Sequence, residues 1–128
     1  MMEIKTKHKK FKTFSDLYQF MCEGHLDEIN VTIKYPDKSK NNGMMPIDMV
    51  LSLKCIEEVK TIDADLKKIA SNHQLDINLA REIAETCNEM NHFDDEDGTL
   101  IAQFEEIDAP LEVKEEIQQL VQNRLQSR

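Results

Sequence analysis

The sequence predicts a mainly α-helical fold with a small β element: an α+β domain of about five helices around one core, with one short two-stranded sheet near the N-terminus. Its 128 residues are 40% hydrophobic and 32% charged, which matches a single helical domain over residues 1–128. Most apolar residues recur every three or four positions, as on one face of a helix. One stretch instead alternates between apolar and polar residues, as in a strand.

Residues 1–13 are predicted to form either a basic N-terminal arm or an edge strand. Ile4 and Thr6 alternate with charged residues, which is typical of a strand. A solvated arm is equally consistent with this stretch, because it contains five lysines: Lys5, Lys7, Lys9, Lys10 and Lys12. The next apolar residues are spaced by three and four, which predicts a short helix with Ser15 as its N-cap and Gly24 at its end.

Residues 29–35 are the clearest predicted strand, because apolar and polar residues alternate until Pro36, which cannot donate to a β-ladder. We expect this strand to pair with residues 3–8. The alternatives are the apolar run 100–104, or the same strand of a second subunit, which would make a homodimer. Residues 37–43 are rich in Asn, Lys and Ser and are predicted to be an exposed loop.

Apolar stripes predict the remaining helices. The stripe over residues 46–72 forms one long helix, or two helices with a break near Thr61, where residues that suit helix caps follow. Asp76 is the expected N-cap of a helix that ends near Asn91. A short helix over residues 100–107 comes next. The terminal helix has an apolar face that consists of Val113, Ile117, Leu120, Val121 and Leu125.

The net charge of −9 is distributed unevenly along the chain. Residues 1–13 carry +4, because five lysines face only Glu3. Residues 94–116, the acidic segment, carry −9, because ten acids face only Lys114. The acids of this segment are the predicted partner-binding residues: Asp94, Asp95, Glu96, Asp97, Glu105, Glu106, Asp108, Glu112, Glu115 and Glu116.

The sequence contains no motif of a catalytic centre, so we expect a protein that is not an enzyme and needs no cofactor. The serines have no surrounding motif of nucleophilic catalysis, and the three glycines are isolated, which excludes a glycine-rich phosphate loop. The three cysteines are odd in number and far apart, so we expect them to be reduced and mostly buried. The remaining alternative is an enzyme subunit whose site another chain completes.

The acidic turn Asp94–Gly98 resembles part of a calcium-binding loop, because Gly98 and Leu100 would hold its sixth and eighth positions. The first and twelfth positions, which supply oxygen ligands in such loops, would then be Phe93 and Phe104. Phenylalanine offers no side-chain ligand, so we predict no metal site.

Part of the chain resembles a helix-turn-helix, and the skeleton residues are Ile69, Ala70, Leu75, Ala80 and Ile83. Gln74 stands where the tight turn of this motif usually has Gly. The alternative function is therefore a DNA-binding regulator that uses residues 66–91 with the basic N-terminal arm, through Asn78, Arg81 and the five lysines. Acidic side chains on the would-be recognition helix disfavour nucleic acid as the partner.

A strong acidic charge without catalytic motifs favours a small inhibitor or adaptor that occupies a basic surface of a partner protein. A nucleic-acid enzyme or a toxin is the expected partner. Immunity proteins and phage-encoded inhibitors are similar in charge and size, which favours a viral or mobile-element protein. No stretch is apolar enough to cross a membrane, and lysines stand where a signal peptide has its apolar centre, so the expected location is the cytoplasm.

Overall fold

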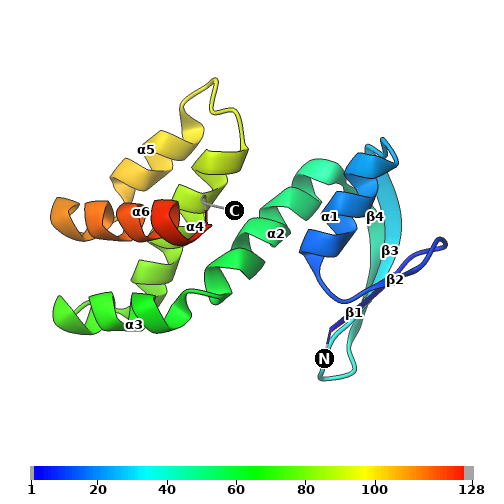
Figure 1. Cartoon of the computed structure of the whole chain (residues 1–128), viewed down its shortest axis with the longest axis horizontal. Coiled ribbons are helices and arrows are strands. Elements are labelled where there is room, and N and C mark those ends of the chain that lie inside the picture. Colours follow the sequence, from blue (N-terminus) through cyan, green and yellow to red (C-terminus); the bar gives the residue numbers. More distant parts are fainter. Residues whose placement is uncertain (1, 126–128) are drawn as a thin grey trace. The chain divides into compact units, whose positions relative to one another are not determined.

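The computed structural model describes residues 2–125, which contain six helices and a four-stranded antiparallel sheet (Figure 1). The predicted α+β class is confirmed, whereas the expected five helices and two strands are corrected to six and four. The chain divides into an N-terminal unit that ends at Glu57 and a C-terminal unit that begins at Glu58, and each is described by itself. That one domain spans residues 1–128 stays a prediction. No helix within residues 2–125 is long and apolar enough to cross a bilayer.

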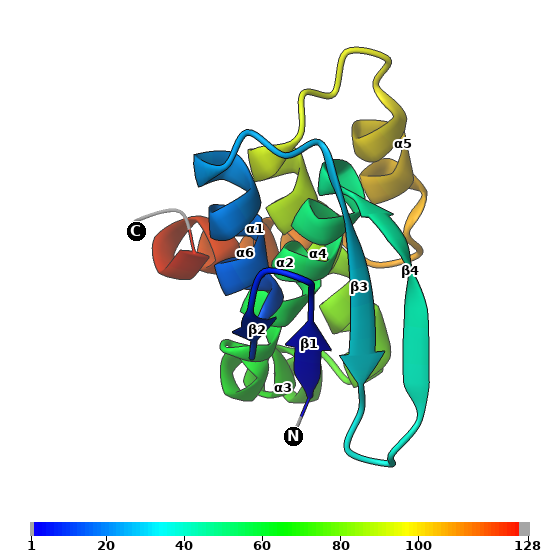
Figure 2. The same ribbon diagram turned by 90° about the vertical axis from the view of Figure 1, so that its right-hand side faces the viewer.

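The N-terminal unit holds the sheet, whose strand order is β2-β1-β3-β4 (Figure 2). The strands are β1 (Glu3–Lys5), β2 (Lys10–Phe11), β3 (Glu28–Lys34) and β4 (Lys40–Pro46). β3 is the strand predicted over residues 29–35, and it pairs with β1 as expected, with Ile4 opposite Ile33. The basic N-terminal stretch is therefore no free arm: β1 lies inside the sheet and β2 forms one edge.

Residues 37–43 are exposed, as predicted, but the predicted loop ends at Ser39, because β4 begins at Lys40. The Tyr35 N–H donates to the Ser39 carbonyl at 3.0 Å, and the Lys38 N–H donates to the Tyr35 carbonyl at 2.9 Å, so a tight turn joins β3 to β4. Lys38 adopts the left-handed conformation that this turn requires, with φ of +70°. β4 is an edge strand with mostly exposed side chains, so its sequence lacks the alternation that reveals a half-buried strand.

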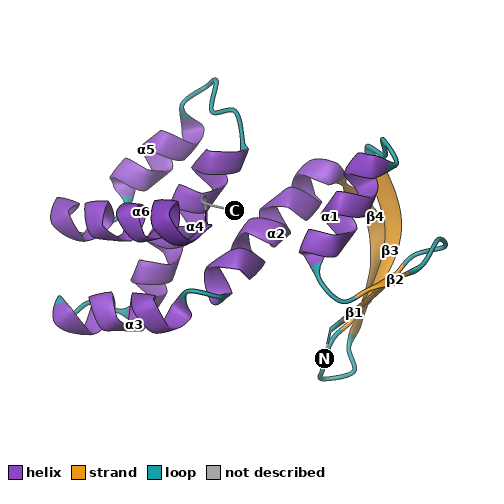
Figure 3. Cartoon of the chain, viewed as in Figure 1, coloured by secondary structure: helices purple, strands orange, loops and turns teal. Residues whose placement is uncertain are grey.

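The helix α1 (Phe14–Glu23) packs on one face of this sheet (Figure 3). The buried core of the unit consists of Ile4, Phe11, Phe14, Leu17, Met21, Ile29, Val31, Ile33 and Val50. The N-cap of α1 is Thr13 and not the expected Ser15, because the Thr13 hydroxyl accepts the Asp16 N–H at 3.1 Å. Gly24 is the C-cap, as predicted.

The apolar stripe over residues 46–72 forms two helices, α2 (Ile47–Lys60) and α3 (Asp63–Asn72), which decides between the two expected alternatives. The Thr61 hydroxyl donates to the Glu58 carbonyl at 2.6 Å. Such a bond competes with the helical ladder, and it favours the predicted break.

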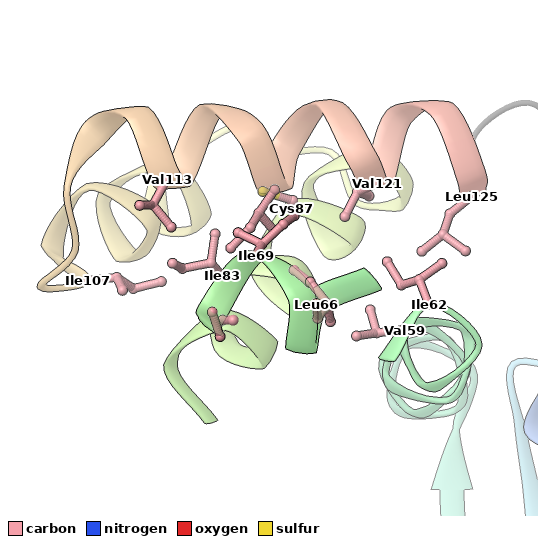
Figure 4. Packing of buried hydrophobic residues seen from close by; sticks show 14 residues of the cluster. Val59, Ile62, Leu66, Ile69, Ile83, Cys87, Ile107, Val113, Val121 and Leu125 are labelled. Atoms are coloured by element: carbon pink, nitrogen blue, oxygen red, sulfur yellow. The ribbon is translucent and has the colours of Figure 1, made fainter. Parts of the chain in front are cut away.

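The C-terminal unit packs α3, α4 (Ile77–His92), α5 (Thr99–Glu106) and α6 (Leu111–Leu125) around a core of fourteen buried residues. Figure 4 shows Val113 and Val121 directed from α6 toward the other helices of this core. Asp76 is the N-cap of α4, as predicted, and its carboxylate accepts the Asn78 N–H at 2.8 Å.

We expect Ile83→Ala to lower the free energy of unfolding by about 2–5 kcal/mol, because Ile83 is fully buried and truncation leaves a cavity. The matched control is Ile101→Ala on α5, where the side chain is 51% exposed. This control should change the free energy by less than about 0.5 kcal/mol. Urea titration followed by circular dichroism measures both, and equal losses would contradict the core assignment.

Candidate functional site

The structure divides the acidic segment into two groups of acids at opposite ends of α5. The acidic loop comprises Asp94, Asp95, Glu96 and Asp97 and precedes the helix. The acidic corner comprises Glu105, Glu106, Asp108, Glu112, Glu115 and Glu116, and it covers the end of α5, the connection and the first turns of α6. Eight helical residues separate two such groups by about 12 Å. The ten predicted acids therefore form two separate groups.

The acidic loop caps α5. The two carboxylate oxygens of Asp95 accept the N–H groups of Leu100 at 3.0 Å and Ile101 at 3.1 Å. Asp97 accepts the Thr99 N–H at 3.1 Å, and this hydrogen bond lowers the pKa of Asp97. Amide groups in the first turn of a helix have no partner within the helix, so these two carboxylates stabilise it. Asp95 and Asp97 thus have a structural role that the charge count alone does not reveal.

The exposed acids of the acidic corner have no lysine of their own segment beside them at the surface, because Lys114 is buried. Lys114 is only 6% exposed, its Nζ donates to the Glu105 carbonyl at 3.0 Å, and it lies 5.4 Å from the centroid of the Phe104 ring. The ring nitrogens of His73, the C-cap of α3, lie close to two acids of the corner, 3.8 Å from Glu112 and 3.0 Å from Glu116.

Four exposed acids of the corner remain without an ion pair within residues 2–125: Glu105, Glu106, Asp108 and Glu115.

Two large apolar side chains are exposed among these acids. Leu111, the first residue of α6, is 66% exposed, and Ile101 on α5 is 51% exposed. α5 has no fully buried residue, although Leu100 and Phe104 are half-buried. Protein interfaces combine apolar anchors of this kind with a charged rim. Sequence periodicity assigned Ile101 to a packed helix face and did not single out Leu111.

The C-terminal unit as a whole is strongly acidic. It carries seventeen Asp and Glu against seven Lys and Arg, a net charge of −10, whereas the N-terminal unit carries nine lysines against eight acids, a net charge of +1. A field of one sign steers an oppositely charged partner toward the surface.

The corner between α3 and α4 has the packing that the helix-turn-helix pattern predicts. Ile69, Ala80 and Ile83 are buried, and Gln74 takes the left-handed conformation with φ of +53° at the position where the motif usually has Gly. This packing does not distinguish a DNA-binding motif from an ordinary helical corner.

The two nucleic-acid contacts expected on α4 already have partners within the unit. Arg81 donates from Nε to Asp63 Oδ1 at 2.8 Å and from Nη2 to Asp63 Oδ2 at 3.0 Å. Asn78 accepts a further bond from Arg81 at 3.2 Å. Binding of a phosphate by Arg81 would first have to break a bidentate ion pair.

The sheet distributes the five N-terminal lysines over β1, β2 and the residues beside them, and all five are exposed. It also brings Lys34 and Lys40 onto the face that carries Lys5. Sequence reasoning missed this grouping. Alternation along residues 29–35 could have placed Lys34 on the solvent face, but the position of Lys40 depends on the register of β4.

The buried thiol of Cys87 has low reactivity. Burial raises the pKa of Cys87 to about 12, so the thiol stays protonated at neutral pH and is a poor nucleophile and a poor metal ligand. Cys55 is also buried and Cys22 is exposed, so two of the three cysteines are buried, in line with the expectation that they are mostly buried. That the chain is not an enzyme stays a prediction.

Asp95→Ala should loosen the first turn of α5, because two N–H groups lose their acceptor. We expect faster hydrogen exchange at Leu100 and Ile101 and a loss of about 0.5–2 kcal/mol in stability. Asp94→Ala is the matched control, since Asp94 is exposed in the same loop. Unchanged exchange in the Asp95 variant would show that the cap is not formed.

Arg81 and Lys67 hold the pKa of Asp63 below its ordinary value, the larger effect being the hydrogen bond from Arg81. A lowered pKa in the folded chain means that the pair stabilises the fold above the ordinary Asp pKa and loses this effect as pH falls through the lowered value. Arg81→Gln should raise the Asp63 pKa, measured by carboxyl-carbon NMR titration. Lys68→Gln should leave it unchanged, and an ordinary Asp63 pKa in the original chain would contradict the pair.

Comparison with known protein families, with curated proteins and with solved structures finds no match to this chain.

Proposed function

We propose that this chain is a small acidic inhibitor or adaptor that occupies a basic surface of a partner protein. The observation that carries the proposal is Leu111, a 66% exposed apolar side chain set among acids of the acidic corner that make no ion pair in the described chain. The contact surface consists of the acidic corner with Leu111 and Ile101.

Charge and apolar area have separate roles on this surface. The carboxylates raise the rate of association with a cationic protein, and they discriminate against acidic partners. The apolar side chains supply free energy once water leaves the contact. The acidic loop contributes charge through exposed Asp94 and Glu96, whereas Asp95 and Asp97 hold the helix that presents Ile101.

The partner proposed is a nucleic-acid enzyme or a basic toxin, because proteins that bind phosphates expose dense lysine and arginine surfaces. Immunity proteins and phage-encoded inhibitors are similar to this chain in charge and size alone. By this analogy we also propose that the chain is of viral or mobile-element origin, acts in the cytoplasm and has no catalytic activity of its own. Self-association to a homodimer stays a further prediction for this chain.

Neutralising the unpaired acids of the corner tests the electrostatic part. The variant Glu105→Gln, Glu106→Gln, Glu115→Gln removes three charges without touching the caps of α5. We expect capture of a basic protein from host lysate at low salt, and about tenfold weaker binding of that protein by the variant, measured by titration calorimetry. The difference should shrink as salt rises.

The matched control removes three exposed acids elsewhere, through Asp16→Asn, Glu23→Gln and Glu82→Gln. It should bind as tightly as the original chain. A separate variant, Leu111→Ala, should weaken binding at every salt concentration, because its effect is not electrostatic. Capture of no basic protein, or equal loss in the control, would contradict the proposal.

A further inference from the structure

The solvent face of the sheet, on the side away from α1, carries a group of lysines that no part of the proposed function uses. Figure 2 looks on to this face. Lysines from three separate stretches of the chain line a hollow of about 1050 Å³ there: Lys5, Lys7, Lys34 and Lys40. We name these four residues the lysine face.

The register of the sheet sets like charges directly against each other on this surface. Lys5 lies opposite Lys10 on the neighbouring strand, and Lys34 lies opposite Lys40. Like charges at directly opposed positions destabilise a sheet. A bound anion would remove this repulsion, so the arrangement suits a surface that is occupied in use.

Two acids, Glu3 and Glu28, also line the hollow, so the four lysines outnumber the acids there by two to one. Glu3 lies opposite Lys34 in the register, and its carboxylate is 3.8 Å from Lys10, outside the group. Within residues 2–125, none of the four lysines makes an ion pair. All four are exposed, so their charge is available to a ligand.

The side chains around the hollow suit phosphate groups. The N-terminal unit contains nine lysines and no arginine, and lysine binds phosphate as a point charge. Between the lysines lie three neutral polar residues, Asn30, Thr32 and Asn42. Lysine with threonine and asparagine is the set of side chains that contacts nucleic-acid phosphates.

The same face offers little for unpaired bases to stack on. Among the described residues that line the hollow, His8 carries the one ring, which packs against Phe20, and there is no Phe, Tyr or Trp. Single-stranded nucleic acids are held largely by stacking on aromatic rings. We propose that the lysine face binds the phosphate backbone of duplex nucleic acid, without reading its sequence. This inference does not rest on the proposed function, since the acidic corner belongs to the other unit.

The test is fluorescence anisotropy of a short labelled duplex DNA of random sequence, titrated with the full chain at several salt concentrations. Contacts from four lysines predict that log Kd rises with log salt with a slope of about 3–4. The variant Lys5→Gln, Lys34→Gln, Lys40→Gln should reduce the slope to about 1 and weaken binding at low salt at least about tenfold. A control with the same net charge, Lys12→Gln, Lys60→Gln, Lys68→Gln, should keep the original slope.

Thermal unfolding provides a second measurement on the same variants. Loss of the opposed charges should leave the midpoint of the lysine-face variant unchanged or raised, so weaker binding cannot be attributed to unfolding. Equal slopes in the original chain and this variant, or equal loss in the control, would overturn the proposal. So would competition by polyglutamate as strong as that by unlabelled duplex, or tighter binding of a single strand. The acidic-corner variant should bind duplex at least as well as the original chain, which separates the two proposals.

Discussion

Alternation of side chains along β3 is the constraint on which the N-terminal unit depends. Successive residues of a strand point to opposite faces, so burying Ile29, Val31 and Ile33 against α1 necessarily turns Asn30 and Lys34 to solvent. The pairing of β3 with β1 and β4 then extends both faces across the sheet. The hydrophobic core and the lysine face are two consequences of one register, and a slip by one residue would exchange them.

A comparable constraint acts in the C-terminal unit at the start of α6. Val113 and Ile117 are buried, and so is Lys114, which comes directly after Val113. The Lys114 ammonium group donates to the Glu105 carbonyl and lies over the Phe104 ring. A cation in this place binds the end of α5, where helix carbonyls lack partners. The acids around it then face solvent without their nearest counterion.

The chain therefore carries two surfaces of opposite charge, each within its own unit. The two surfaces differ in the side chains that accompany the charge. The acidic corner combines charge with exposed Leu111 and Ile101, which is the composition of a protein interface. The lysine face combines charge with small polar side chains, and of the large apolar residues that line the hollow, Leu26, Ile29 and Met44, only Met44 is exposed, which suits a hydrated polyanion. An inhibitor of a nucleic-acid enzyme that also contacts the nucleic acid would use both.

The sequence by itself determined the α+β class, the strand over residues 29–35, and the caps Asp76 and Gly24, because these follow from local periodicity and capping chemistry. It favoured a partner near Ile4 for this strand, and the structure decided for that partner among the three alternatives. It also located the acidic segment, which is a matter of composition. Only the tertiary structure decided β4, since an edge strand exposed on both faces has no apolar alternation.

Tertiary structure likewise separated the acids of the segment by role. Charge counting treats Asp95 and Glu105 alike, yet one carboxylate accepts two helix N–H groups and the other faces solvent. The lysine face shows the same limit, because Lys5, Lys34 and Lys40 come together only through strand register. Local sequence encodes the elements and their net charge; which charged groups meet depends on pairing between residues far apart in the chain.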